Sequence, residues 1–160
     1  MSIQKGIPRV VGSGEGRKLR VLENEMEIKL GSAETAGAVF AFEDTMRPGD
    51  AVPPHVHSRE DEILTVLEGE YEIFLDGKTY EATAGTVANF PRNIVHGFRN
   101  VSDQPARALF VVTPGENFER FFHELSSIAP DVPADMAKLA ELFSRYGLPI
   151  VAASAGASAA

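Results

Sequence analysis

Residues 49–69 read GDAVPPHVHSREDEILTVLEG, and residues 85–100 read GTVANFPRNIVHGFRN. Three imidazoles and a carboxylate from these stretches would suit a first-row transition metal. If the side chains converge, a metal ion lies at the centre of the protein's chemistry. The four candidate ligands, which include three of the chain's four histidines, are His55, His57, His96 and Glu62.

Alternation along a strand explains how the first stretch can present two ligands. Residues two apart on a strand point to the same face, so His55 and His57 can reach one ion. Glu62 follows where the chain has room to bend and re-enter as the next strand. Asp61 should point away from it, whereas Glu60 would share its face, and only the spacing disfavours Glu60 as the acidic ligand.

The second stretch provides the third imidazole. The turn residues 91–93 predict a strand over residues 94–99, with His96 near its middle and with Ile94 and Phe98 on the same face. A lone buried histidine is more often hydrogen-bonded in a core than bound to a metal. Burying four polar groups inside one small barrel without an ion would, however, cost several kcal/mol. We therefore interpret the group as a metal site.

The remainder of residues 19–113 consists of short, alternating segments separated by turn residues. Asp76 and Gly77, for example, suit the two positive-φ positions of a tight hairpin. Many short strands without interleaved helices predict an all-β sandwich or barrel. The expected strands are 19–22, 26–30, 38–46, 71–75, 78–82, 86–90, 94–99 and 106–113.

Two amphipathic helices are expected after residue 113. The segment Thr113–Glu116 has the spacing of a capping box, with Pro114 at the first helical position. Gly147 suits the position that follows the second helix. We expect both apolar stripes to pack on the outside of the sheet rather than form a lid over a pocket. The stripes are Phe118, Phe121, Phe122 and Leu125 in the first helix, and Met136, Leu139, Ala140, Phe143 and Tyr146 in the second.

Composition excludes several functional classes. The 160 residues suit one domain, and 44% hydrophobic and 24% charged residues are ordinary for a soluble globular protein. A net charge of −8 argues against nucleic acid as a partner. The chain has no cysteine, so disulfides and thiolate ligands are excluded. Without a secretory signal or an apolar run of about 18 residues, we expect no membrane association and a cytoplasmic location.

The two stretches resemble the conserved motifs of the cupin superfamily. The second departs once, because Asn93 stands where the family usually has glycine; asparagine tolerates the left-handed backbone better than other non-glycine residues. The resemblance covers about residues 36–114. Only 15 residues, 70–84, separate the motifs, which is similar to the compact bacterial single-domain branch. The matching residues are Gly49, His55, His57, Glu62 and Gly69 in the first motif, and Gly85, Pro91, His96 and Asn100 in the second.

This resemblance implies a double-stranded β-helix (jelly-roll) cupin barrel with two C-terminal helices. It also implies one divalent ion held by His55, His57, Glu62 and His96, and Fe, Mn, Ni, Co, Cu and Zn all accept that ligand mix. We divide the single domain into an N-terminal segment with leading strands, the barrel core, the helices packing on the barrel, and a flexible tail. The boundaries are 1–35, 36–114, 115–150 and 151–160.

The helix over residues 118–125 resembles the C-terminal extension of quercetin-dioxygenase-like cupins. The resemblance implies a dioxygenase of a small enol or phenolic substrate, with dioxygen as co-substrate and Glu62 as a catalytic base. An isomerase, epimerase or lyase that uses the metal as a Lewis acid is the first alternative, and a non-catalytic small-molecule-binding barrel is the second. A homodimer is expected because it is common in the superfamily. Candidate substrate contacts are Phe40, Phe42, Tyr71 and Phe98.

Overall fold

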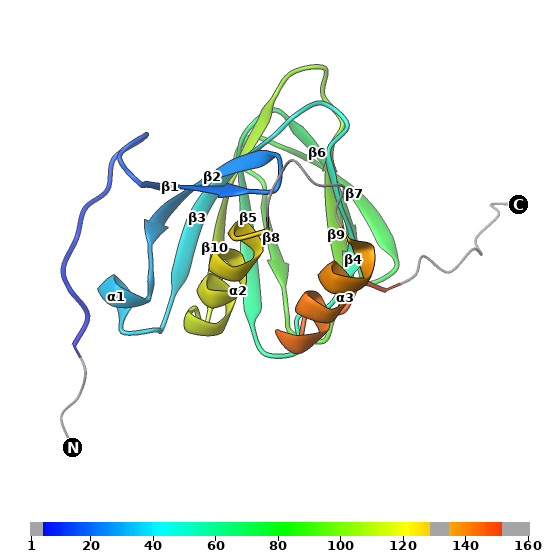
Figure 1. The fold of residues 1–160 in the computed structure, drawn as a ribbon. Coiled ribbons are helices and arrows are strands. Elements are labelled where there is room, and N and C mark those ends of the chain that lie inside the picture. The colour runs from blue at the N-terminus through cyan, green and yellow to red at the C-terminus, as the bar shows by residue number, and fades with distance from the viewer. Residues whose placement is uncertain (1–4, 129–134, 152–160) are drawn as a thin grey trace, which may run out of the picture.

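The computed structural model describes residues 5–128 and 135–151, so residues 152–160 of the expected tail lie outside the described residues. Two antiparallel sheets face one another and form the barrel (Figure 1). The six-stranded sheet, in spatial order, contains β1 (Arg17–Val21), β2 (Asn24–Leu30), β3 (Phe40–Met46), β10 (Ala106–Thr113), β5 (Asp61–Glu68) and β8 (Val87–Phe90). The four-stranded sheet contains β4 (Ala51–His55), β9 (His96–Asn100), β6 (Glu70–Leu75) and β7 (Lys78–Thr83). The expected all-β jelly-roll barrel is confirmed.

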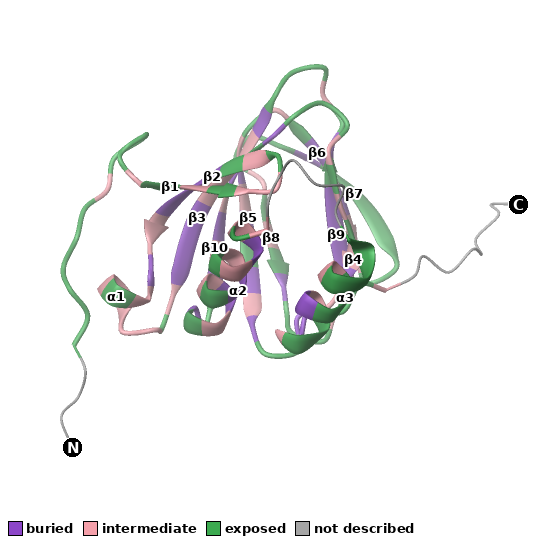
Figure 2. Ribbon diagram, in the orientation of Figure 1, coloured by how far each residue is buried: buried purple, intermediate pink, exposed green. Residues whose placement is uncertain are grey.

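Strand β10 shows how the alternation of side chains builds the core. It pairs with β3 on one side and with β5 on the other, at the middle of the six-stranded sheet. Every second residue, Ala106, Ala108, Phe110 and Val112, is buried, and the intervening residues are half-buried or exposed. The period of two therefore directs one face of the sheet into the barrel, where the buried residues gather (Figure 2).

Two positive-φ positions agree with the turn chemistry of the sequence. Asp76 and Gly77 have φ of 48° and 79° and join β6 to β7, as predicted. Asn93 has φ of 64°, so asparagine occupies the left-handed position that glycine would otherwise take. One boundary was wrong: residues 94–95 lie between the turn and the strand, and His96 is the first residue of β9 rather than its middle.

The two longer helices differ in how they begin. Besides the four-residue α1 (Ser32–Thr35), the described chain has α2 (Glu116–Ser126) and α3 (Met136–Arg145). The capping-box expectation was wrong: Gly115 is the N-cap of α2, without a side-chain cap hydrogen bond, while Thr113 ends β10. In α3 the side chain of Asp135 accepts hydrogen bonds from the backbone N–H groups of residues 137 and 138. Gly147, with φ of 75°, follows the helix as expected.

The expected apolar stripe of α3 needs two corrections, because Met136 and Ala140 are both exposed. Met136 is 69% exposed, and the buried residue of the helix is Leu142. Leu139, Phe143 and Tyr146 are partly buried against the core. Met136 is the first residue of the helix, so it lies at the end of the element and beyond the surface that the later turns cover.

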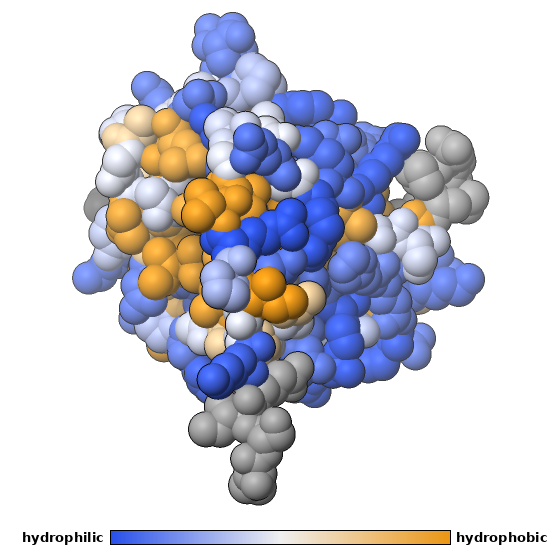
Figure 3. Space-filling model, turned by 90° about the vertical axis from the view of Figure 1, so that its left-hand side faces the viewer, coloured by the Kyte–Doolittle hydropathy of each residue, from blue (hydrophilic) through white to orange (hydrophobic). Residues whose placement is uncertain are grey.

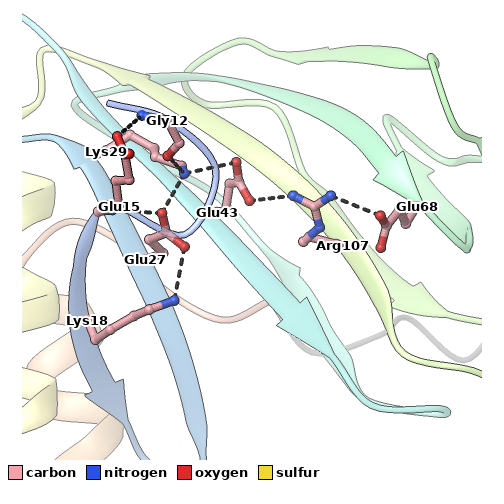
Figure 4. A network of polar contacts seen from close by, with 9 residues as sticks. Gly12, Glu15, Lys18, Glu27, Lys29, Glu43, Glu68 and Arg107 are labelled. Atoms are coloured by element: carbon pink, nitrogen blue, oxygen red, sulfur yellow. Dashed lines mark hydrogen bonds and ion pairs between the residues drawn. The ribbon is translucent and has the colours of Figure 1, made fainter. Parts of the chain in front are cut away.

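A polar network joins the N-terminal segment to the outer face of the six-stranded sheet (Figure 4). The ammonium of Lys29 contacts the carboxylates of Glu27 and Glu43 and donates to the carbonyl of Gly12 over 2.9 Å. Arg107 continues the chain of ion pairs, with Nη1 2.6 Å from a Glu43 oxygen. Charges of both signs therefore satisfy one another on the face of the sheet that points away from the barrel.

The side of the molecule shown in Figure 3 carries hydrophobic residues beside a broad hydrophilic area. Ile7 and Val10, in the segment before β1, are 61% and 97% exposed. Exposed apolar surface of this kind is compatible with the expected homodimer, which stays a prediction.

Candidate metal centre

Three of the four candidate ligands lie on strands and the fourth lies in a loop, and all four meet inside the barrel. His55 is the last residue of β4 and pairs in register with His96, the first residue of β9. His57 lies two residues beyond β4, and Glu62 is on β5. Their exposed fractions are between 0% and 6%, and one ligand atom from each residue lies within 4.8 Å of those from the other three. Residues far apart in the sequence thus form one buried group.

Distances within the group fit a shared ion. The Nε2 atoms of His55 and His57 are 3.0 Å apart, and an oxygen of Glu62 lies 3.3 Å from Nε2 of His96 and 3.8 Å from Nε2 of His57. Two ligand atoms at right angles and about 2.1 Å from one ion would be about 3.0 Å apart. Despite the nearby carboxylate, Nε2 of His96 is buried without a hydrogen-bond partner among the described residues. A metal ion would provide that partner.

Backbone carbonyls orient two of the rings. The carbonyl oxygen of Pro53 lies 2.9 Å from Nδ1 of His55, and the carbonyl oxygen of Ile94 lies 3.0 Å from Nδ1 of His96. A carbonyl oxygen only accepts, so each Nδ1 carries the proton and donates it. Each Nε2 then has its lone pair free toward the centre of the group, which is the tautomer that binds a metal through Nε2.

Burial also keeps the imidazoles in their metal-binding form. Removal from water, together with a smaller effect of the nearby charge of His96, lowers the pKa of His55 to about 4 and that of His57 to about 3. Both rings are therefore neutral near pH 7, with lone pairs available to an ion.

The neighbouring acidic residues have other partners. Glu60 is 1% exposed, but its carboxylate accepts a hydrogen bond from Asn117 over 2.6 Å, and it lies outside the group of four. Asp61 lies on the other face of β5 and forms an ion pair with Arg92 over 2.7 Å. Of the three consecutive carboxylates, the structure brings Glu62 to the imidazoles.

A cavity of about 290 Å³ opens beside the group, and His55, His57 and Glu62 form part of its wall. Phe42 and Phe98, two of the four aromatic residues expected to contact a substrate, line it. The other two, Phe40 and Tyr71, are fully buried, pack against Phe42 and Phe98 respectively, and are not part of the lining. The wall is mainly apolar, as is usual for small-molecule sites.

The C-terminal helices lie against this cavity, which corrects the expectation that their stripes pack on the outside of the sheet. The Phe118 ring of α2 lies 5.0 Å from the His57 ring, and Phe122 and Leu125 of the same helix line the cavity with Phe143 of α3. Spacing along a helix identifies an apolar face but says nothing about what that face covers. Here it covers the space beside the candidate ligands.

Sequence reasoning missed a closing segment after α3. The N–H of Ser58 donates to the carbonyl of Gly147 over 2.8 Å, and the N–H of Val151 donates to the carbonyl of Pro54 over 2.9 Å. These bonds place Leu148 and Ile150 in the cavity wall. The apolar run that follows Gly147 was the available signal.

A polar residue in the wall was also missed. Asp44 lines the cavity, on β3. The sequence signal for it was that every second residue of this strand faces inward and is apolar, except for one acid. These positions are Phe40, Phe42, Asp44 and Met46.

Comparison with known proteins agrees with this architecture. The Cupin domain family matches residues 42–112. The polyketide synthase CurC of Streptomyces cyaneus is 35% identical over 67% of this chain and 70% of its own length. Quercetin 2,3-dioxygenase of Bacillus subtilis is 29% identical over 74% of this chain, which spans about a third (35%) of that relative. The structure of KdgF from Halomonas superposes with a TM-score of 0.62 at 18% identity, over 70% of this chain and 98% of KdgF, and is similar in fold.

Within residues 5–128 and 135–151, no helix has the length and apolar character needed to span a bilayer.

Proposed function

The chain belongs to the cupin superfamily, and on that premise we propose that it is a metal-dependent dioxygenase of a small enol or phenol. The observation that carries this proposal is a buried group of three imidazoles and one carboxylate in the wall of an apolar, aromatic cavity. Four protein ligands around an octahedral ion leave two positions, so the bound ion would supply sites for a substrate oxygen and for dioxygen.

The protein's own side chains have three tasks in this reaction. Phe42, Phe98 and Phe118 line the cavity and would hold an aromatic or enol ring by apolar contact. The same side chains would keep water out of the site, which strengthens the electrostatic interactions inside it. The carboxylate of Glu62, which faces the imidazoles, would accept the hydroxyl proton of the enol and leave its oxygen anionic.

Two relatives support an enolic substrate. Quercetin 2,3-dioxygenase is named for a flavonol, which carries an enol hydroxyl beside a carbonyl. CurC is named as a polyketide synthase, and polyketide chains contain dicarbonyl units that enolise and cyclise to phenols. Both chemistries offer adjacent oxygen atoms that can bind one ion together.

The test compares aerated and anaerobic turnover. The protein, reconstituted in turn with each of the six candidate metals, is incubated with a panel of flavonols and β-diketones. Product that forms only with oxygen, and that takes up label from ¹⁸O₂, is the expected result. The His57→Ala variant serves as the inactive control. If none of the six metals supports oxygen-dependent turnover, dioxygenase activity on this substrate class is refuted.

The second candidate is an oxygen-independent isomerase, epimerase or lyase that uses the metal as a Lewis acid. The comparison with CurC supports it, because that relative is named as a polyketide synthase rather than an oxygenase, and it matches at higher identity and over a larger share of its own length than the dioxygenase does. Turnover that continues under anaerobic conditions would distinguish this candidate. Tight binding of a panel compound without turnover would instead indicate a non-catalytic binding protein.

A further inference from the structure

Asp44 stands on the inner face of the barrel, among apolar neighbours. On β3 it occupies the same face as Phe42, which also lines the cavity. Its register partners on the adjacent strands are Met26 of β2 and Ala108 of β10, both at most 3% exposed. Among the described residues that line the cavity, the acidic ones are Asp44 and the candidate ligand Glu62.

This carboxyl group has no compensating cation in the described part of the chain. It forms no ion pair within the described ranges, unlike Glu43 next to it, which is paired with Arg107 on the outer face. Burial, with a smaller contribution from the charge of Asp50, raises the pKa of Asp44 to about 6, although a hydrogen bond from the N–H of Thr45 acts in the opposite direction. The pKa of Tyr71 is raised by its own burial and by the charge of Asp44, and the Tyr71 hydroxyl has no hydrogen-bond partner among the described residues.

Packing alone gives no reason for an acid at this position. Because position 44 is an inward-facing position of β3 between Met26 and Ala108, an apolar side chain would pack there without a desolvation cost. A polar group that weakens the fold and faces a ligand cavity is typical of a binding or catalytic position. A carboxyl group that lines the cavity and has no ion-pair partner among the described residues therefore points to a hydrogen-bond donor on the ligand.

We propose that Asp44 is a second polar anchor of the cavity, which accepts a hydrogen bond from a hydroxyl group of a ligand whose other end lies at the four candidate metal ligands. The ligand class is a planar enol or phenol with chelating oxygens at one end and a hydroxyl at the other. Because the proposal rests on the proposed function, the experiment must separate the failure of one from the failure of the other. A cavity of about 290 Å³ restricts the ligand to a compact molecule.

The probes are 3-hydroxyflavone and 3,4′-dihydroxyflavone, which share the chelating end and differ by one distal hydroxyl. Binding of each is measured anaerobically to the zinc-loaded full chain, so that no oxidation occurs. Asp44→Leu removes the acceptor and suits the apolar neighbours. Glu25→Gln removes a negative charge from the exposed outer face of β2 and is the control for net charge.

We expect the wild type and Glu25→Gln to bind the dihydroxy probe about tenfold more tightly than the monohydroxy probe. Asp44→Leu should bind both probes equally, with the affinity for 3-hydroxyflavone maintained or increased. Equal binding of both probes by the wild type, or a preference that survives in Asp44→Leu, would overturn the role of Asp44 while leaving the proposed function intact. Failure of the wild type to bind either probe would overturn both.

Discussion

The side-chain amide of Asn117 donates a hydrogen bond to Oε1 of Glu60 over 2.6 Å. Its nitrogen also lies 3.2 Å from the carbonyl oxygen of Tyr146, and its oxygen accepts from Arg59 over 3.1 Å. Asn117 of α2 therefore connects the end of α3 to the short segment between His57 and Glu62. This contact also explains why Glu60 lies outside the metal group.

Replacing Asn117 by alanine should lower the free energy of unfolding by roughly 1–3 kcal/mol, because the buried carboxyl of Glu60 loses its hydrogen-bond donor. The metal content should stay at one equivalent, since Glu60 is not in the group of four. Denaturant unfolding and elemental analysis measure the two effects. In the matched variant Glu60→Gln, an acceptor for Asn117 is kept, so a much smaller loss is expected. A stability equal to that of the wild type in Asn117→Ala would show that the contact contributes little.

Removal of one imidazole should abolish stoichiometric metal binding. His57→Ala takes away a ligand whose Nε2 lies 3.0 Å from that of His55, so the affinity should fall by more than the roughly 10–100-fold typical of outer-shell changes. Elemental analysis of purified protein measures the result. His123→Ala is the control, because this side chain is 54% exposed and lies on α2 away from the group. Unchanged metal content in His57→Ala would refute the ligand assignment.

Metal should stabilise the folded protein by mass action. An ion that binds the folded state alone adds about 2.7 kcal/mol when its free concentration is 100 times Kd. A chelator should therefore lower the Tm of the wild type, and restoring the metal should recover it. The same titration on His57→Ala should leave Tm unchanged. A wild-type Tm that does not change when the chelator is added would contradict tight metal binding.

Asp44 should make stability depend on pH in a defined direction. Its pKa is raised from the ordinary 3.8 to about 6 by burial, so between these values the unfolded chain releases a proton that the folded chain keeps. The contribution of Asp44 therefore becomes unfavourable as pH rises from about 4 to 6 and stays constant above that. Asp44→Asn should gain stability over the wild type by roughly 1–3 kcal/mol at pH 8 and little at pH 4.

Urea unfolding of both proteins across this range gives the difference directly, because the other titrating groups are common to the two. Asp103→Asn removes a carboxylate from an exposed side chain that has no ion pair among the described residues, and it should not reproduce the gain. A difference between Asp44→Asn and wild type that is independent of pH would contradict the raised pKa.

Position 69 requires glycine for two reasons, its left-handed backbone conformation and the lack of space for a side chain. Its φ is 81°, and a Cβ atom added there would lie 2.5 Å from Cβ of Ala106 on β10. Gly69→Ala should therefore combine left-handed strain of roughly 1–2 kcal/mol with a steric term of similar size. Gly77, with φ of 79° and open space around it, isolates the first effect. Equal losses for the two alanine variants in denaturant unfolding would exclude the steric term.

Several features could be read from short-range patterns. The turn at Asp76 and Gly77, the left-handed Asn93 and the alternation of β10 follow from rules that act over a few residues. The same reasoning located the histidines and narrowed the acidic ligand to Glu60 or Glu62. It failed at the start of α2, where Thr113 belongs to a strand, because pairing of β10 with β3 and β5 outweighs a local capping signal.

The order of residues by itself determined the barrel class, the ligand chemistry and the face that each strand residue occupies, since all three depend on residue type and on a period of two. Tertiary structure alone decided which surfaces meet. It placed the Phe118 face against the cavity and Glu62 beside the imidazoles, and it paired Glu60 with Asn117. It also left Asp44 without an ion pair among the residues that the structure describes. The physical reason is that a side chain's burial, pKa and partners depend on groups brought close by folding, and spacing along the chain does not specify those groups.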